Sequence, residues 1–307
     1  MISQEEFLSI STPDVAKLVR ESGSKVCVFP INGTRRWFAL EHASKAQEND
    51  PDPIQAYMNI ASQNHISLYR LFFDHGIDTL LTPEFGTELL LRGDEYVQRI
   101  GADGLARLAS HPLFVDFYED YSVRVHFYGE YQRYLSQTSH GYLVDLFKKI
   151  EEITSKNTSH RLFIGVFGAD ATQTISEYSV EYHKNKGVIP NKEQIIEMYY
   201  GESVEPVNLF IGFDKFSAFD YPLLSNGEED LYFTVAPSPY MSQSQLRSIL
   251  YDHIYTRQTA EIAYEKMPVE DFQWLKAFYT KNIDTTFGTG IIKAGVWIPT
   301  SQLSLPG

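Results

Sequence analysis

Apolar residues recur at helical spacing along several stretches of the chain. The longest pattern begins at Ile54 and continues to Asp74, and Gly76 follows at a typical helix end. Because positions three and four residues apart share one face of a helix, this spacing predicts a helix over residues 54–74. Similar patterns, several with a capping residue or proline at the start, predict helices at 12–21, 94–109, 143–153, 171–183, 192–200 and 242–257.

Short runs of β-branched and aromatic residues lie between these helical patterns. Several of the runs stop at proline or glycine, as at Pro30, Pro83 and Gly168. Strands that alternate with helices favour an α/β fold, here a six-stranded, mostly parallel sheet covered by helices. No linker, repeat or low-complexity segment divides the sequence, so residues 1–307 are expected to form a single domain. The expected strands are at 26–29, 77–82, 123–127, 161–167, 207–213 and 231–236.

The turn after the first strand contains the residues best suited to bind an anion. Asn32 and Gly33 are followed by Thr34, Arg35 and Arg36, and a helix is expected to start there. A strand that enters a helix through a Gly-containing turn directs free backbone N–H groups at a ligand above the turn. Two guanidinium groups add donors that match phosphate oxygens. The pattern indicates a phosphate or diphosphate site, although a solvated surface turn has the same pattern.

Composition excludes several classes of protein. The net charge of −14 argues against nucleic-acid binding and indicates that Arg35 and Arg36 are not part of a generally basic surface. No signal peptide is recognisable, and no apolar run reaches the roughly 18 residues of a membrane span. The single cysteine, Cys27, lies in an apolar run and fits a cytoplasmic location. Aromatic residues make up 14% of the chain; most are expected in the core, but their ring faces also stabilise carbocations.

The anion-binding turn resembles a known signature. Asn32-Gly33-Thr34-Arg35-Arg36-Trp37 is similar to the D-G-N-x-R-W motif with which cis-prenyltransferases bind the diphosphate of an allylic substrate. The wider context is closer to one branch of that superfamily, the tuberculosinol/isotuberculosinol synthases, also described as tuberculosinyl adenosine transferases. The matching segments span roughly residues 25 to 257 and include RGDEY at 92–96, FYGEY at 127–131, HRLFIGVFG at 160–168, YYGE at 199–202 and LYFTVAPSPYM at 231–241.

The resemblance implies a reaction as well as a cis-prenyltransferase-like fold and a homodimer. It implies a diterpene synthase that ionises a bicyclic C20 diterpenyl diphosphate of the halimadienyl, kolavenyl or tuberculosinyl type. Water would then capture the allylic cation to give a diterpene alcohol and diphosphate. One alternative is transfer of the diterpenyl group to adenosine or another nucleophile. Another is a non-catalytic subunit that binds a prenyl diphosphate or a partner enzyme.

The same resemblance implies roles for particular residues. Arg35 and Arg36 would be catalytic and would bind the diphosphate together with the backbone amides of Gly33 and Thr34. Active-site tyrosines of the tuberculosinol branch correspond to Tyr57 and Tyr96, although a core tyrosine is the alternative at Tyr57.

The chain also departs from the cis-prenyltransferase pattern. Asn32 occupies the place of a loop aspartate that contacts Mg²⁺, so Mg²⁺ is expected to be held largely by the substrate diphosphate. Asp230 stands at the place of a metal-binding glutamate, but a strand-end surface aspartate is the alternative there. Gly212 and Lys215 replace two arginines that hold isopentenyl diphosphate, which favours a reaction with one diphosphate and no chain elongation.

Overall fold

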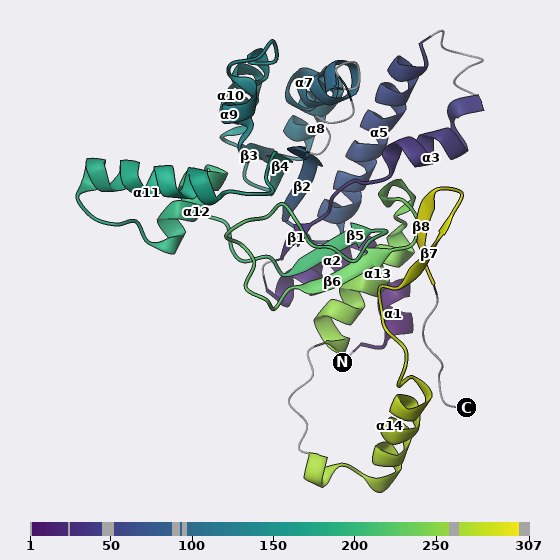
Figure 1. The fold of residues 1–307 in the computed structure, drawn as a ribbon. Coiled ribbons are helices and arrows are strands. Elements are labelled where there is room, and N and C mark those ends of the chain that lie inside the picture. The colour runs from purple at the N-terminus through teal and green to yellow at the C-terminus, as the bar shows by residue number, and fades with distance from the viewer. Residues whose placement is uncertain are drawn as a thin grey trace.

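A computed structural model of the chain describes residues 2–23, 25–44, 52–87, 93, 97–257 and 264–300. Its central sheet has six strands in the order β3-β4-β2-β1-β5-β6, and all neighbouring pairs are parallel (Figure 1). Helices pack on both faces, so the predicted α/β fold class is confirmed. The strands are β1 (Val26–Val28), β2 (Thr79–Phe85), β3 (Val123–Tyr128), β4 (His160–Val166), β5 (Leu209–Phe213) and β6 (Asp230–Thr234).

Four of the predicted helices, α2, α5, α10 and α12, begin and end within one residue of the expected positions. Two short helices, α1 and α9, were not predicted, because their 6 and 5 residues are too few for a helical period to emerge. No bounds were predicted for α8, whose apolar residues follow one another without a helical spacing. Among the described residues before 252, the α-helices are α1 (Gln4–Ser9), α2 (Thr12–Glu21), α3 (Thr34–Glu41), α5 (Pro53–Asp74), α7 (Asp103–Ser110), α8 (Pro112–Asp120), α9 (Tyr131–Leu135), α10 (Tyr142–Thr154), α11 (Thr172–Lys186), α12 (Lys192–Tyr200) and α13 (Gln243–Tyr251).

Alternate residues of each strand enter two separate cores. Cys27 of β1 belongs to a large core, where α1, α2, α5, α7, α8, α10 and α13 cover one face of the sheet. Val26 and Val28 face the smaller core on the other side, where α12 packs. Because both faces are covered, the strands read as nearly continuous apolar runs rather than as alternating patterns.

The sequence predicted that the second strand stops at Pro83. In the structure, strand β2 instead continues through Pro83 to Phe85. Phe29 donates its N–H to the Leu81 carbonyl, so the polar groups of alternate β2 residues, including Pro83, are directed toward β1. Strand β1 ends at Val28, which pairs with Leu81, so Pro83 has no β1 residue beside it. The missing N–H of Pro83 therefore removes no hydrogen bond from the sheet. The extension places Glu84 in the strand.

Two predicted helices contain π-helical turns. Within residues 94–109, a π-helix at Val97–Ala102 precedes α7, while 94–96 lie outside the described residues. The helix predicted over 242–257 is α13 followed by a π-helix at Asp252–Thr256. Apolar spacing alone does not distinguish these geometries, because a single wide turn shifts the pattern by only one residue.

The C-terminal part contains elements that were not predicted from the sequence. Helix α14 (Val269–Lys281) and the antiparallel hairpin of β7 (Gly290–Lys293) and β8 (Val296–Pro299) follow the body of the sheet, and α14 projects away from it (Figure 1). Helix α14 has no buried residue. Within the described ranges, no helix combines the length and the apolar character of a membrane span.

Candidate active site

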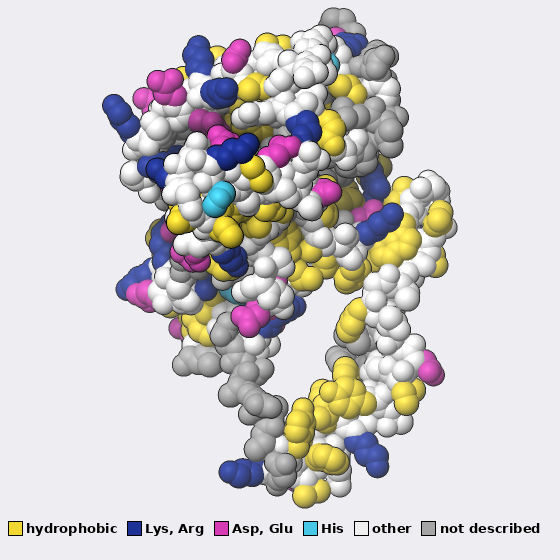
Figure 2. Space-filling model, turned by 60° about the vertical axis from the view of Figure 1, so that its left-hand side comes forward, with side chains coloured by type: hydrophobic (Ala, Val, Ile, Leu, Met, Phe, Trp, Pro, Cys, Tyr) yellow, Lys and Arg dark blue, Asp and Glu magenta, His cyan; other side chains and the backbone are white. Residues whose placement is uncertain are grey.

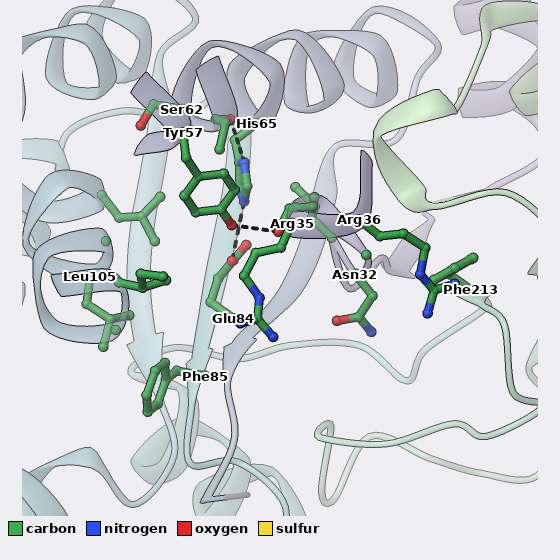
Figure 3. Close-up of a pocket in the computed structure, with 18 of the residues that line it drawn as sticks. Asn32, Arg35, Arg36, Tyr57, Ser62, His65, Glu84, Phe85, Leu105 and Phe213 are labelled. Atoms are coloured by element: carbon green, nitrogen blue, oxygen red, sulfur yellow. Dashed lines mark hydrogen bonds and ion pairs between the residues drawn. The ribbon is translucent and has the colours of Figure 1, made fainter. Parts of the chain in front are cut away.

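A cavity of about 580 Å³ lies beyond the carboxyl ends of β1, β2 and β5 (Figure 3). Parallel sheets bind ligands at this edge, because the loops that leave neighbouring strands meet there. The turn at 31–36, one face of α5, the end of β2, the segment from 100 to 114 and the loop after β5 all contribute to its lining.

The turn at Asn32–Gly33 is fixed by the segment that follows β6. The N–H of Asn32 donates to Ser238 Oγ at 3.1 Å, and the N–H of Ser238 donates to the Asn32 carbonyl at 3.0 Å. Gly33 caps α3 in the left-handed conformation, with φ of 79°. An added Cβ at Gly33 would lie 2.9 Å from both Phe213 and Pro237. Only glycine therefore fits, and α3 starts with its first N–H groups beside the cavity.

Both predicted arginines line the cavity. Arg36 places its Nη1 3.6 Å from Asp214 Oδ2, and its guanidinium lies 5.3 Å from the centre of the Phe213 ring. Figure 3 shows the side chains of Arg35, Asn32 and Arg36 on the same side of α3. The structure therefore brings together the loop amides and the two guanidinium groups that the sequence assigned to diphosphate binding.

Tyr57 lies at the same turn, although it comes from a distant helix. Its hydroxyl is 2.8 Å from Thr34 Oγ1, and its ring packs edge-on against Phe38. Tyr57 lines the cavity, so the structure places it beside the predicted diphosphate site rather than inside the core. Tyr96, the other predicted tyrosine, lies outside the described residues.

The far part of the cavity is apolar. Gly101 of the π-helix packs so closely on Phe85 that an added Cβ would lie 2.5 Å from its ring. This end has the character of a hydrocarbon-binding site, because it offers apolar contact and little hydrogen bonding. Its other apolar lining residues are Met58, Ile100, Leu105, Leu108 and Phe114.

The cavity wall contains a largely buried ion pair that was not predicted from the sequence. His65 of α5 places Nε2 3.4 Å from Glu84 Oε2 of β2, and the two side chains are 12% and 13% exposed. Burial opposes the charged imidazolium, but the charge of Glu84 and the hydrogen bonds to Glu84 and Ala61 outweigh it, so the pKa of His65 is raised. The helical spacing of residues 54–74 places His65 on the apolar face of α5. Its partner Glu84 could not be predicted, because the sequence indicated that β2 stops at Pro83.

Asp230 does not reach the cavity. It is the first residue of β6, at the sheet edge opposite to the carboxyl ends, and its carboxylate lies 2.6 Å from His253 Nδ1 and 3.2 Å from Arg257 Nη1. Asp214, which the sequence did not single out, does line the cavity, and its Oδ1 is buried with no hydrogen-bond partner among the described residues. Within those residues, no cluster of three or more His, Cys, Asp or Glu side chains is arranged to hold a metal ion.

The fold defines the class of protein. A lavandulyl diphosphate synthase from Lavandula x intermedia, solved with dimethylallyl diphosphate, superposes with a TM-score of 0.60 at 12% identity, covering 76% of this chain and 97% of the other. A probable undecaprenyl diphosphate synthase from Campylobacter jejuni superposes with a TM-score of 0.52 at 14% identity, covering 78% of this chain and 97% of the other. The chain thus has the fold of the cis-prenyltransferases.

Sequence relatives narrow this class to a family. A tuberculosinyl adenosine transferase from Mycobacterium tuberculosis is 42% identical over 299 residues, which cover 97% of this chain and 98% of the relative. A (+)-kolavelool synthase from Herpetosiphon aurantiacus is 27% identical over 252 residues, covering 80% of this chain and 79% of the relative. No protein-family model matches the chain. The chain belongs to the tuberculosinyl adenosine transferase family of enzymes.

Proposed function

We propose that this protein is a diterpene synthase that ionises a bicyclic C20 diterpenyl diphosphate of the halimadienyl, kolavenyl or tuberculosinyl type. Water captures the allylic cation, and the products are a diterpene alcohol and diphosphate. The observation that carries the proposal is a single cavity in which a turn with Arg35 and Arg36 adjoins an apolar end. One end suits a diphosphate and the other a hydrocarbon. The names of both relatives, a tuberculosinyl transferase and a kolavelool synthase, support a diterpenyl substrate.

Stabilisation of the leaving group is the main chemical task. When the allylic C–O bond breaks, its electron pair stays on the diphosphate. Arg35, Arg36 and the amides of Gly33 and Thr34 would bind the oxygens on which this charge develops, which lowers the barrier directly. The Thr34 hydroxyl and the Tyr57 hydroxyl, 2.8 Å apart, orient each other beside the same oxygens. The apolar end would hold the cation away from bulk water.

The residues at the turn also fit Mg²⁺ bound through the substrate. Mg²⁺ usually keeps several waters and takes one or two carboxylates together with substrate phosphates. Asp214, with one carboxylate oxygen lacking a hydrogen-bond partner among the described residues, and the amide oxygen of Asn32 are the protein groups that would hold it. When bound, Mg²⁺ neutralises charge on the diphosphate.

Transfer to adenosine or another nucleophile is the second candidate, and the mycobacterial relative's name favours it. One experiment separates the alternatives. The protein is incubated with a panel of bicyclic C20 diphosphates, with and without adenosine, and diphosphate and organic products are measured by mass spectrometry. Diphosphate release with a free alcohol supports the synthase, and an adenosine adduct supports the transferase. Neither product on any substrate would favour a non-catalytic prenyl-diphosphate-binding subunit.

Two further properties belong to the same proposal, namely a homodimer and a cytoplasmic location. The family resemblance supports the homodimer. β6 is also the edge strand of the sheet, and Leu231 on it is 41% exposed. The location is supported by the single thiol, since Cys27 is buried and has no second cysteine with which to form a disulfide. Light scattering of the purified full chain would test the dimer.

Chain elongation is not expected. Incubation with isopentenyl diphosphate and a short allylic diphosphate should give no elongated polyprenyl diphosphate by mass spectrometry. At Gly212 an added Cβ would lie within 2.9 Å of Phe210 and Phe233, so the strand has no room for an arginine there. Lys215 lines the cavity but offers a point charge instead of a paired guanidinium. Detection of elongated products would overturn the single-diphosphate mechanism.

A carboxylate at position 32 is not expected to be required for activity. The wild type should be active and stimulated by Mg²⁺, and Asn32→Asp should mainly lower the Mg²⁺ concentration for half-maximal rate, by roughly tenfold, because it adds a charged ligand. The rate would be measured across a Mg²⁺ titration. Asn226→Asp, at an exposed amide outside the cavity, is the matched control and should leave the titration unchanged. An inert wild type beside an active Asn32→Asp variant would contradict this expectation.

A further inference from the structure

Two carboxylates, Asp214 and Glu84, line the described part of the cavity, and neither belongs to the turn at 31–36. Asp214 faces Arg36 in the loop after β5. Glu84 comes from β2 and lies beneath His65 of α5 (Figure 3). The turn itself has the neutral Asn32 rather than a carboxylate. The proposed mechanism of ionisation assigns no task to Glu84 or to His65.

The hydrogen bonds around Glu84 define where the protons are. His65 Nδ1 lies 2.8 Å from the Ala61 carbonyl, which can only accept, so Nδ1 carries a proton. Nε2 then faces Glu84 Oε2, and this contact is favourable only if a proton lies between the two atoms. Oε1 of Glu84 accepts from the hydroxyl of Thr82 at 2.6 Å and from that of Tyr69 at 3.3 Å. Three side chains, those of His65, Thr82 and Tyr69, therefore direct polar groups at the two oxygens of Glu84.

This arrangement leaves Glu84 able to accept one more proton. A carboxylate oxygen has two acceptor positions, and Oε2 uses only one of them in the described contacts, toward His65. The imidazolium offsets the carboxylate charge, and the donors to both oxygens lower the tendency of the carboxylate to attack a nearby carbocation. Packing alone gives no reason for the pair, because ion pairs taken out of water contribute little to stability compared with apolar residues of similar size.

We propose that Glu84 is the catalytic proton acceptor of the terminating step and that His65 is its positioning residue. The inference rests on the proposed function. After the allylic C–O bond has broken and the diphosphate has left with the electron pair, the oxygen of water forms a new C–O bond to the cation. The resulting oxonium passes its proton to Glu84, and the neutral alcohol is formed. The carboxylic acid returns the proton to solvent when the product leaves.

An isotopic experiment tests this role. The substrate carries ¹⁸O at the bridging oxygen, so that ionisation followed by return of the cation moves the label to a non-bridging position. In Glu84→Gln, turnover should fall by about 10²-fold or more, the usual contribution of a positioned general base. The ratio of label exchange to turnover should rise in this variant. Ionisation continues, but an oxonium that keeps its proton loses water again, and the cation then returns to the diphosphate. The dissociation constant for an unreactive diphosphate analogue should stay within about twofold of wild type, since the arginine turn is intact.

Other variants keep the result interpretable. Glu84→Asp retains a carboxylate and should recover roughly a tenth of turnover or more, with exchange close to wild type. His65→Asn should lower turnover less than Glu84→Gln does. Glu151→Gln removes another largely buried carboxylate, on α10 outside the cavity, and should leave turnover and exchange unchanged. Thermal unfolding of each variant shows that it is folded.

Each outcome decides the inference. Unchanged turnover in Glu84→Gln would overturn it while leaving the proposed function intact. Loss of turnover without a rise in exchange, or with loss of analogue binding, would also overturn it, because Glu84 would then serve ionisation or binding. A wild type that releases no diphosphate from any substrate would count against the proposed function itself, and the inference would fall with it.

Discussion

Arg36→Ala should lower diphosphate release by about 10²- to 10³-fold while the protein stays folded, because a preorganised donor to the developing charge would be lost. Arg36 is placed by the first turn of α3 and held against Phe213 and Asp214. These contacts place the guanidinium beside the turn, where the charge of the leaving diphosphate would develop. The rate of diphosphate release under single-turnover conditions is the measurement, because it reports the chemical step separately from product release.

A matched arginine elsewhere controls for loss of charge. Arg133 has a side chain 39% exposed, against 40% for Arg36, and it pairs with Glu130 and Glu177 away from the cavity. Arg133→Ala should therefore retain wild-type turnover, since Arg133 does not line the cavity, and thermal unfolding would show whether loss of its pair with the buried Glu130 destabilises the protein. Undiminished turnover in Arg36→Ala would remove the assignment of the diphosphate site.

Gly33→Ala should reduce turnover by about 10²-fold or more through displacement of the diphosphate turn, because a misplacement near 1 Å has an effect of this size. Gly33 has a φ of 79°, and its Cβ would approach Phe213 and Pro237 to 2.9 Å. Pro237 precedes Ser238, whose hydrogen bonds hold Asn32, so relief of the clash moves the turn itself. Turnover and thermal unfolding would both be measured.

Gly187→Ala is the control variant for Gly33→Ala, because it introduces the same backbone strain without a steric clash. Gly187 ends α11 with φ of 74°, and an added Cβ there would meet no atom within 4 Å. Both variants should lose about 1 kcal/mol of stability to backbone strain, since a residue with a side chain is strained in the left-handed region, and Gly33→Ala should lose more because of its clash. Only Gly33→Ala should lose activity. Wild-type turnover in Gly33→Ala would show that the turn tolerates displacement and does not position the diphosphate.

The sequence determined the class of fold because most strands appear as short apolar runs and most long helices have an apolar pattern of helical period. The apolar face of α5 and the caps of α2 and α12 are local signals, and they placed these helices within one residue. The turn from Asn32 to Arg36 was also recognisable, because a strand-turn-helix with glycine and paired guanidiniums binds anions by means of its own backbone.

The tertiary structure decided the features that depend on contacts between distant segments. Pro83 reads as a strand end, yet β2 continues through it, because β1 has already ended on that side. Asp230 reads as a candidate metal ligand, yet the parallel direction of β6 places it at the far edge of the sheet. Local patterns contain no information about where neighbouring strands begin and end.

The sequence by itself thus determined the parallel α/β fold, and it predicted the anion-binding turn and the position of Tyr57 on one face of its helix. Only the tertiary structure placed the Tyr57 hydroxyl beside Thr34, paired His65 with Glu84 and directed Asp214 toward Arg36. The physical reason is that helical and strand periodicity arise within a few residues. A site at the edge of a sheet instead joins side chains from segments far apart in the chain. By their numbering, His65 and Glu84 are separated by 19 positions in the sequence, and Arg36 and Asp214 by 178.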